Sequence, residues 1–503
     1  MNLRAIAWLV GRVVQLLAVF LIVPAGVALY YGEGDDALVF AATAVGSSLL
    51  GYALAFRNLG STVTVEGRPD FYRREGLAAV GLSWLVVPLL GAVPFVATGA
   101  IPDPVDAFFE SASGFTTTGS TILLAAEIDA LSHAVAFWRS LAHWLGGIGI
   151  VLVFVVFFPT GGRSLFRSEV PGIAREAVQQ RVRDSALGLA RIYVALTGLE
   201  VLALALAGMT PFDAVIHAFG SLATGGFSNR GASVAFYASF TIEAIIIVFM
   251  FLAGLNFAVY EVGLRQGWRA CLRFVRRSSE VRAYVWSTLL GALVIGGTLW
   301  FWGGSNGAAE SELPDYSRLG TCLRDSTFAV VSVRTGTGFA TADFDRWPEL
   351  CRAGLMLLMV VGACAGSTGG GLKVVRFLIA VKVALRGVLA FSRPRALHPI
   401  RIDGEVLDEE VVGSVTGYFA LWMLVFAAVT LALTGMGVGL VSAATATIAT
   451  LNNIGPGLDQ VGPWGSFADI PLVGKVLLSG TMILGRLEFY ALVVLLVPRF
   501  WRS

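Results

Sequence analysis

Residues Ser111–Thr121, SASGFTTTGST, form the stretch around which the rest of the sequence is organised. A long apolar segment and a short run, Pro104–Glu110, precede it, and another long apolar segment follows. Three related stretches recur at similar intervals: Gly220–Ser228 (GSLATGGFS), Ser332–Ala340 (SVRTGTGFA) and Leu451–Gly457 (LNNIGPG). Four glycine-bearing loops, each between two membrane-length helices, predict a fourfold pore built from a single chain.

The composition indicates a polytopic membrane protein. Of the 503 residues 56% are hydrophobic and only 14% are charged, whereas a soluble protein carries about 25% charged residues. Apolar runs near the roughly 20 residues needed to cross a bilayer recur along the chain. The net charge of +2 says nothing about nucleic acid, because the Arg residues are confined to particular loops and do not gather on one surface; we expect no nucleic-acid partner. No nucleophile–base or metal-ligand pattern is present in the sequence, so the pattern disfavours an enzyme.

The four cysteines, Cys271, Cys322, Cys351 and Cys364, have no metal-like CxxC spacing. We expect each of them to be a buried free thiol. Cys322 and Cys351 both fall near helix ends on the same predicted side of the membrane, so a disulfide between them is the alternative.

The apolar segments predict an all-α fold with two N-terminal helices, residues 5–31 and 38–56, followed by four repeated units. The first segment is too long and lacks the small-residue cleavage pattern of a signal peptide, so we expect a retained helix. Each unit consists of an outer helix, a half-helix, a Gly-rich loop and a second helix. The predicted helices are 76–98, 104–115 and 134–158; 186–209, 211–222 and 237–262; 283–302, 318–331 and 351–383; 412–433, 438–451 and 472–497. The corresponding segments are 1–58 for the helix pair and 59–160, 161–264, 265–400 and 401–503 for the four units.

The distribution of Arg predicts the orientation of these helices. Loops between the units are rich in Arg, as is the C-terminus, and cytoplasmic loops characteristically carry such an excess. Acidic residues gather in the loops on the other side. We therefore expect both termini in the cytoplasm and all four Gly-rich loops opening outward. Four residues depart from the rule: Arg139, Arg230, Arg318 and Arg346.

The loops have the chemistry of an ion-selective filter. An ion that sheds its water needs replacement oxygens, which rings of backbone carbonyls supply. Directing successive carbonyls toward one axis requires positive φ angles, which Gly adopts without steric cost, and Thr adds a hydroxyl oxygen. The alternative for any single loop is that its glycine only allows two helices to pack closely. The predicted ion-binding residues are Thr117, Thr118, Gly119, Thr224, Gly225, Thr337, Gly338, Asn453, Ile454 and Gly455.

These loops resemble those of a known family. Ser113–Thr121, His217–Ser228, Val330–Phe344 and Asn452–Gly457 resemble the pore loops of the Trk/Ktr/HKT superfamily of potassium transporters, and Gly362–Lys373 is similar to its intramembrane loop. Gly485–Glu488 is similar to the family's last helix, and the extra N-terminal helix pair is similar to that of the TrkH subunit.

The resemblance implies potassium uptake across the bacterial inner membrane, with K⁺ as the ion bound in the filter and no organic cofactor. It makes Gly119, Gly225, Gly338 and Gly455 the filter glycines. Since a Ser at the first of these places is associated with sodium-permeable plant relatives, Gly119 favours potassium. The resemblance also implies a homodimer embedded in membrane lipid and a cytoplasmic TrkA-type nucleotide-binding regulatory subunit.

The Gly-rich stretch beneath the third loop is a candidate gate, because it interrupts an apolar segment too long for one straight crossing. Without the family, a packing kink is an equal alternative. We expect Arg486 to face the pore near this stretch, since an intramembrane charge is functional by default; a structural ion pair with Glu488 of a neighbour or with Asp325 is the alternative. The predicted gating residues are Gly366, Gly369, Gly370, Gly371, Lys373 and Arg486.

The remaining buried polar residues have ordinary interpretations. Arg334 precedes Gly338 by four residues, and we expect it to point behind the filter or to pair with Asp325. Glu200 and Glu243 are expected to snorkel or to lie at helix ends, and His143 and His217 to be satisfied core histidines.

Three other functions remain as alternatives to a gated potassium pore. A secondary symporter coupled to H⁺ or Na⁺ would need titratable residues along the path, which the filter stretches do not offer. The ion-translocating subunit of a pump, as in the related KdpA proteins, would need an ATPase partner. A membrane-embedded enzyme is the least favoured of the three.

Overall fold

The chain folds into an α-helical bundle, and the computed structural model describes residues 1–56, 73–157, 175–306, 315–392 and 398–502. Among these residues, six helices are long and apolar enough to span a membrane, and a seventh span results if one bent pair is counted together. The bundle is therefore that of a multi-pass membrane protein, and the predicted all-α class is confirmed. The one departure is a hairpin of two-residue strands, β1 (Arg401–Ile402) and β2 (Glu405–Val406).

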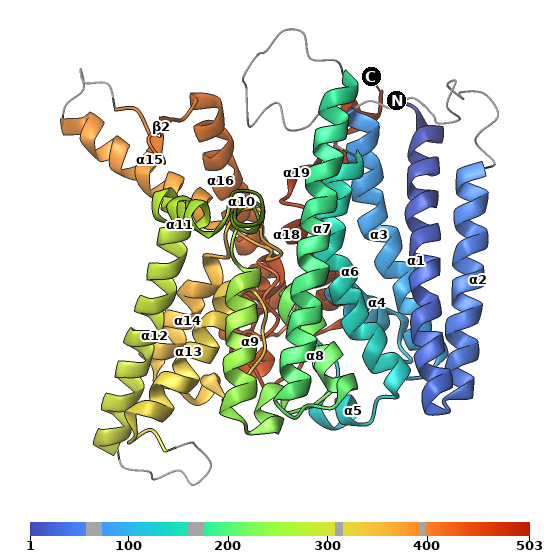
Figure 1. The fold of residues 1–503 in the computed structure, drawn as a ribbon, viewed down its shortest axis with the longest axis horizontal. Coiled ribbons are helices and arrows are strands. Elements are labelled where there is room, and N and C mark those ends of the chain that lie inside the picture. Colours follow the sequence, from blue (N-terminus) through green and yellow to red (C-terminus); the bar gives the residue numbers. More distant parts are fainter. Residues whose placement is uncertain (57–72, 158–174, 307–314, 393–397, 503) are drawn as a thin grey trace.

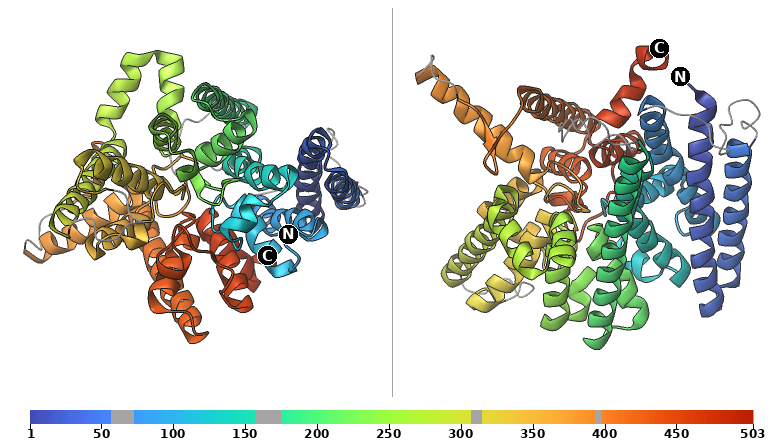
Figure 2. Two further views of the ribbon diagram at one scale, coloured as in Figure 1. Left: turned by 90° about the horizontal axis from the view of Figure 1, so that it is seen from below. Right: turned by 45° about the horizontal axis from the view of Figure 1, so that its top comes forward.

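Two antiparallel helices, α1 (Leu3–Tyr31) and α2 (Gly34–Phe56), open the chain and stand at the edge of the bundle (Figure 2). Their turn is shorter than expected, because Asp35 and Asp36 belong to the first turn of α2, where the helix dipole favours carboxylates.

The first two units follow the predicted order. Unit 1 consists of α3 (Arg73–Ala97), α4 (Pro104–Phe115), the short α5 (Ala125–Asp129) and α6 (His133–Phe157). Unit 2 consists of α7 (Arg175–Leu206), α8 (Pro211–Ala223), the 3₁₀ turn η2 (Ser233–Tyr237), α9 (Phe240–Ala253) and α10 (Ala258–Gln266), after which α11 (Trp268–Arg277) leads to unit 3.

The last two units contain more breaks. Unit 3 consists of α12 (Ser279–Asn306), α13 (Leu319–Thr335), η3 (Phe344–Arg346), α14 (Glu349–Val360) and α15 (Val374–Ser392). Unit 4 consists of α16 (Glu409–Gly435), α17 (Leu440–Leu451), η4 (Asp459–Val461), α18 (Leu472–Arg486), α19 (Tyr490–Val493) and η5 (Val494–Leu496), and α20 (Pro498–Arg502) ends the chain.

The half-helices α4 and α8 begin at matching signals. Asp103 accepts hydrogen bonds from the backbone N–H of Val105 (2.8 Å) and Asp106 (3.1 Å), and Pro104 occupies the first helical position. Thr210 caps α8 through Asp213 N–H at 3.1 Å, again with Pro next. An N-cap followed by Pro stabilises a helix start because the lost proline N–H would have no helical partner.

Two predicted straight helices are wrong. The span expected at 237–262 breaks after Ala253, and α10 is bent by 91° from α9. The helix expected at 472–497 ends at Arg486, because Glu488 and Phe489 have φ of 53° and 66°. The third long segment, 351–383, breaks between α14 and α15 as expected, with residues 361–373 forming a loop.

Figure 2 shows how the units are placed: seen from below, they follow one another in sequence order around a common centre, with the N-terminal pair outside. Both chain ends lie at one end of the bundle, and α5 lies at the other (Figure 1). Some predicted features lie outside the described residues, namely the unit boundaries at 58 and 160 and the loop residues Arg57, Arg163, Arg167, Arg393 and Arg395.

Candidate functional site

Each half-helix leads into a loop with the same backbone conformation. In every unit a residue with φ above +50° is followed two positions later by a glycine with φ between 78° and 104°. The pairs are Thr117 and Gly119, Thr224 and Gly226, Gly336 and Gly338, and Asn453 and Gly455. Only Gly adopts the second of these conformations without strain, which explains its recurrence.

The hydrogen bonds that end the half-helices give the same register. In each loop the residue between the two positive-φ positions donates its N–H to the carbonyl five residues earlier. The four bonds are Thr118 to Ser113 (2.9 Å), Gly225 to Gly220 (2.8 Å), Thr337 to Ser332 (2.9 Å) and Ile454 to Ala449 (2.9 Å). Thr118, Gly225, Thr337 and Ile454 are therefore structurally equivalent.

This register differs from the sequence-based one in unit 2. The structure places Gly226, and not Gly225, at the position of Gly119, and Gly225 takes the place of Thr118. The doublet Gly225–Gly226 does not by itself decide which glycine matches Gly119, but aligning Phe227 with Phe339 would have given the register. A side chain is excluded at Gly225 because a Cβ there would lie 2.4 Å from the His143 ring.

The four loops touch in a closed ring. A Cβ added to Gly119 would lie 2.0 Å from the carbonyl oxygen of Gly225, and one on Gly226 would lie 1.9 Å from that of Thr337. A Cβ on Gly338 would lie 2.3 Å from the Ile454 carbonyl, and one on Gly455 would lie 3.0 Å from that of Thr118. Each glycine thus abuts the main chain of the next unit. Gly119, Gly226, Gly338 and Gly455 are called the glycine ring below.

Side chains behind the ring fix the loops. The hydroxyls of Thr116 and Thr118 bond at 2.7 Å, and those of Thr335 and Thr337 repeat this contact at 2.7 Å. Asn453 donates its amide N–H to Thr118 Oγ1 at 2.8 Å, which ties unit 4 to unit 1. Thr118 and Thr337 therefore use their hydroxyls within the protein.

Two buried side-chain oxygens at the inner end of the loops have no hydrogen-bond partner among the described residues. They are Thr117 Oγ1 and Asn453 Oδ1, and Thr117 and Asn453 occupy equivalent positions in units 1 and 4. A buried oxygen without a donor is costly unless a water or a cation lies against it. These two oxygens, together with carbonyls, form a set of hard ligands that suits an alkali cation.

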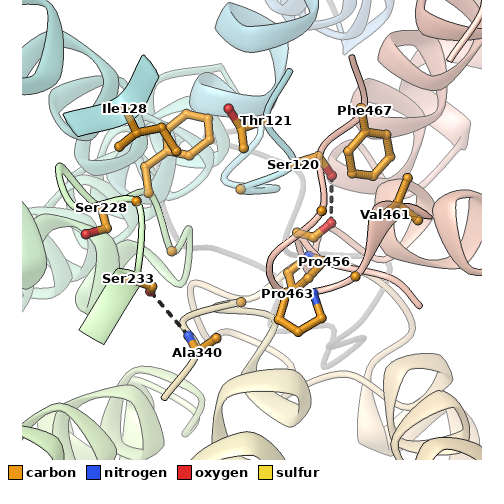
Figure 3. A pocket seen from close by; sticks show the side chains of 18 of the residues that line it. Ser120, Thr121, Ile128, Ser228, Ser233, Ala340, Pro456, Val461, Pro463 and Phe467 are labelled. Carbon is orange, nitrogen blue, oxygen red and sulfur yellow. Dashed lines mark hydrogen bonds between the residues drawn. The ribbon is translucent and has the colours of Figure 1, made fainter. Parts of the chain in front are cut away.

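A cavity of about 550 Å³, including its open mouth, lies on one side of the ring (Figure 3). All four ring glycines line it, and residues after each loop form its walls. Figure 3 shows Ser120 beside Pro456 across the cavity from Ser228 and Ala340, and the Ser120 hydroxyl donates to the Gly455 carbonyl at 2.8 Å. The four units therefore build one vestibule.

A buried ion pair supports this vestibule. Arg139 Nη2 lies 2.7 Å from Glu110 Oε1, and the two side chains are 1% and 0% exposed. Glu110 also accepts from Thr121 Oγ1 (2.9 Å) and Ile122 N–H (3.1 Å), while Arg139 Nη1 donates to Ser228 O (3.1 Å). Arg139, which departs from the Arg distribution, thus links α4, α6 and the second loop. Arg230, another such residue, pairs with Asp213 at 3.0 Å.

The 361–373 loop packs against the other side of the ring. A Cβ on Gly369 would lie 2.9 Å from Thr335 O, one on Gly370 2.3 Å from Asn453 Oδ1, and one on Gly371 2.8 Å from Asn452 Cβ. These contacts place the tip of the loop directly beneath the ends of α13 and α17.

Neighbouring units hold the 361–373 loop. Cys364 N–H donates to Gly254 O (3.0 Å), and Phe257 N–H donates to Gly366 O (3.0 Å), both at the break between α9 and α10. Ala365 N–H donates to Glu280 Oε1 at 2.6 Å. Lys373 is buried and donates to Gly369 O within the loop itself.

Arg486 crosses the space beneath the glycine ring. Its Nη1 donates to Thr368 O of the loop in unit 3 (2.6 Å), and its Nη2 donates to Gly146 O of α6 in unit 1 (2.8 Å). Units 1 and 3 lie opposite each other around the centre (Figure 2). The guanidinium, 1% exposed at the end of α18 in unit 4, therefore lies between opposite quarters of the bundle.

The alternative ion pairs of Arg486 and Arg334 with Asp325 are wrong. Arg486 bonds only backbone oxygens in the described chain, and Glu488 pairs instead with Arg376. Arg334 donates to Ser287 Oγ (2.8 Å) and Val361 O, and does not reach Asp325. Asp325 lies nine residues earlier in α13, about 13 Å along the helix axis, so the pair cannot form.

The expectations for the remaining buried histidines and glutamates are confirmed only in part. His217 is satisfied through Asp213 O (2.8 Å) and Ser228 Oγ (3.1 Å), as expected for a core histidine. His143 Nδ1 bonds Gly114 O at 2.7 Å, but its Nε2 has no partner among the described residues, so the expectation holds for one nitrogen. Glu243 lies in the first turn of α9 and pairs with Arg324, a helix-end role, whereas Glu200 is fully buried in α7 and does not snorkel.

All four cysteines are free, so the disulfide alternative is wrong. Cys322, Cys351 and Cys364 are buried as expected, whereas Cys271 is partly exposed, so the expectation of a buried thiol is wrong there.

Comparisons with known proteins agree with this architecture. The family model described as "TrkH: Cation transport protein" matches residues 52–503. The Trk system potassium uptake protein TrkH of Salmonella typhimurium is 37% identical to the chain, and that of Escherichia coli K12 is 36% identical, over the full length of both proteins in each case. The crystal structure of the potassium transporter TrkH from Vibrio parahaemolyticus superposes with a TM-score of 0.87 at 33% identity, covering all of both chains.

These matches confirm the family resemblance, and the family is one of transport proteins and not of enzymes. Taken with the fourfold arrangement of the units, they identify the chain as a member of the TrkH family of cation transport proteins.

Proposed function

We propose that this protein takes up potassium through a gated pore in which the glycine ring and its neighbours form the selectivity filter. The observation that carries the proposal is the closed ring of contacts between units, in which every ring glycine abuts a carbonyl-bearing residue of the next loop. Carbonyl oxygens held at one axis replace the water of a dehydrated cation.

The choice of potassium rests on three features. The relatives are named potassium uptake proteins. The first ring position is Gly119, where sodium-permeable plant relatives of this superfamily carry Ser. The fourth loop, Ile454–Gly457, comes closest to the TVGYG pattern of potassium channels. The unpartnered Thr117 and Asn453 oxygens would complete a cation site at the inner end of the filter.

We place the vestibule outside the cell and both termini in the cytoplasm. Both chain ends lie at one end of the bundle, the Arg-bearing helix α11 lies toward the same end, and the vestibule opens away from them. Potassium would then enter from the vestibule, pass the ring and meet the 361–373 loop. The unit boundaries predicted from the sequence, 59–160, 161–264, 265–400 and 401–503, belong to this same proposal.

The 361–373 loop and Arg486 are the proposed gate. The loop tip touches the inner ends of two half-helices, and Arg486 joins it to the opposite unit beneath the ring. A guanidinium in this place opposes a passing cation, and Gly366, Gly369, Gly370 and Gly371 give the loop freedom to withdraw. Lys373 would hold the loop tip closed through Gly369. A second copy of the chain and a nucleotide-binding regulatory subunit of TrkA type are the proposed partners.

Growth of a potassium-uptake-deficient bacterium at low potassium tests the proposal. The wild-type chain is expected to restore growth. Gly119→Ser is expected to lose most potassium uptake, because its Cβ would meet the Gly225 carbonyl at 2.0 Å, and the remaining flux is expected to shift toward sodium. Gly198→Ser is the control, because Gly198 in α7 has open space where a Cβ would lie. An unchanged ion preference in the Gly119 variant would contradict the filter assignment.

Coupled symport is the alternative mechanism. Among the described residues, the charged side chains lining the vestibule are Arg139 and Arg230, each already paired with a carboxylate, so no free acid is available to carry a proton there. Potassium flux into proteoliposomes with and without an imposed pH gradient separates the two mechanisms. A pore predicts the same initial rate at a fixed membrane potential.

A further inference from the structure

Helices α10 and α11 form a hairpin that leaves the bundle sideways. The 91° bend after α9 turns α10 away from the direction of the membrane-spanning helix before it. Figure 2 shows the hairpin projecting from unit 2, and Figure 1 places it toward the end of the bundle that carries both termini. α12, a membrane-spanning helix, begins at Ser279 directly after α11. The hairpin therefore lies at the level where a spanning helix enters the bilayer.

The outer face of α11 combines a basic arc with exposed apolar side chains. At 100° per residue, its four Arg residues fall on one continuous arc of about 100°. These residues are Arg269, Arg273, Arg276 and Arg277, all exposed. Trp268 (67% exposed) and Leu272 (45% exposed) flank this arc, and Leu264 at the end of α10 is 76% exposed.

The inner face of α11 packs on the protein. Cys271, Phe274 and Val275 pack against a core cluster that includes Val259 of α10 and Val281 of α12. Apolar packing thus holds the hairpin in its orientation. Trp268 and Leu272 do not take part in this packing and remain exposed.

The basic arc has no acidic partner in the described part of the chain. None of its four guanidinium groups forms an ion pair there, although Arg269 lies over the Trp268 ring at 5.5 Å. The nearby Arg265 differs, because it pairs with Glu261 at 2.9 Å. Four clustered, uncompensated cations repel one another unless an external anion lies against them.

We propose that α11 is a binding surface for anionic phospholipid headgroups, with Trp268, Leu272 and Leu264 inserted at the boundary between headgroups and acyl chains. A helix that lies in the membrane plane with Arg beside Trp and Leu matches the chemistry of an interfacial anchor. Tryptophan prefers the depth of the headgroups, and each Arg near an anionic surface adds attraction. The proposal rests on the membrane placement within the proposed function and not on the identity of the transported ion.

The anchor is joined to the proposed gate through a short path. Gly254 and Phe257, which flank the break between α9 and α10, bond Cys364 and Gly366 of the 361–373 loop at 3.0 Å each. Lipid bound to α11 therefore fixes the hairpin whose first residues hold the loop.

Native mass spectrometry of the full-length protein, titrated with phosphatidylglycerol or phosphatidylcholine, tests the proposal. We expect Arg273→Gln to weaken phosphatidylglycerol binding about fivefold, and the Arg269, Arg273, Arg276 and Arg277→Gln quadruple variant to lose the preference for phosphatidylglycerol over phosphatidylcholine. The control is Glu261→Gln with Arg265→Gln, which removes an ion pair without changing the net charge and leaves the binding unchanged.

A second measurement tests the position of the helix. In lipid nanodiscs, brominated phosphatidylglycerol is expected to quench the part of the fluorescence that Trp268→Phe removes. Unaltered phosphatidylglycerol affinity in the quadruple variant would overturn the proposal, as would the absence of that quenching. A change in oligomeric state, or loss of a regulatory subunit, with intact lipid binding would assign the face to a protein partner and also overturn it. Lipid affinity is measured without flux, so this result is independent of the filter experiment.

Discussion

The loops around the vestibule and the segments beneath them belong to the same four units, yet they behave in opposite ways. Above, the four loops share their positive-φ positions and their terminal hydrogen bonds. Below, the second helices differ: α6 is continuous, α9 turns by 91° into α10, α14 and α15 are separated by a loop, and α18 ends at Arg486.

The difference follows from what each level must do. In the proposed filter, an ion on the axis would meet all four loops at once, so each unit would have to present the same backbone there. Beneath the ring no such demand exists, and one unit supplies a loop while its neighbours hold it through Gly254, Glu280 and Arg486. Symmetry is retained where four units act together and lost where one unit acts on the others.

The largest effect is expected from breaking the ring at Gly226. Gly226→Ala should abolish transport, because the new Cβ meets the Thr337 carbonyl at 1.9 Å and the residue has φ of 78°. Gly225→Ala should also fail, since its Cβ meets the His143 ring. Potassium flux in proteoliposomes measures both.

A second substitution separates these two glycines. Gly225→Ala combined with His143→Ala should recover part of the flux, because the obstacle was a side chain. No side-chain substitution should rescue Gly226→Ala, where the obstacle is the main chain. Rescue of Gly226→Ala by His143→Ala would show that the register of the second loop is the one expected from the sequence.

The next effect concerns the ion pair between Arg139 and Glu110, which supports the loops around the vestibule. Arg139→Met should destabilise the fold by about 3–5 kcal/mol, because Glu110 would be left as an unpaired buried carboxylate. Denaturant unfolding in detergent measures this loss. The double variant with Glu110→Gln should recover much of it, since the uncompensated charge is gone; equal stability of the single and double variants would mean that the pair is not what supports the vestibule.

Removing contacts beneath the ring should raise the potassium flux, whereas breaking the ring should lower it. Arg486→Met should raise potassium flux by about tenfold or more without a regulatory subunit, because a unit charge near the axis contributes a few kcal/mol at an effective dielectric constant near 20. Arg486→Lys keeps the charge but not the fork that binds two carbonyls. If Lys and Met raise the flux equally, the bridge to Thr368 and Gly146 matters more than the charge.

A smaller increase is expected at Glu280. Glu280→Ala removes the acceptor for Ala365 N–H, and the loss of one buried hydrogen bond, worth about 1–3 kcal/mol, should raise the flux severalfold. Glu280→Gln retains an oxygen at the same place and should leave the flux near the wild-type value. An equal rise in flux in the two variants would mean that the effect comes from the charge of Glu280 and not from the hydrogen bond.

The sequence predicted the features that depend on local chemistry and missed those that depend on neighbours. The predicted bounds of the half-helices at 104–115 and 211–222 match the observed ones closely, because the Asp–Pro and Thr–Pro signals that start these helices are local sequence features. The register of Gly225 and Gly226 is decided by His143 and Thr337, which are distant in sequence. The breaks after Ala253 and Arg486 fall within apolar runs where hydropathy gives no warning.

The smallest effect is expected where a charge lies close in sequence to the ring but far from it in space. Asp325→Asn should leave the ion preference unchanged, because Asp325 does not pair with Arg334, which instead reaches Ser287 and Val361 and lies over Tyr284 at 5.8 Å. Arg334→Lys should lower thermal stability, since a single ammonium cannot replace both contacts of the guanidinium. Competition between sodium and potassium in the flux assay checks the prediction for Asp325→Asn. A shift in ion preference in this variant would mean that the charge of Asp325 affects the glycine ring.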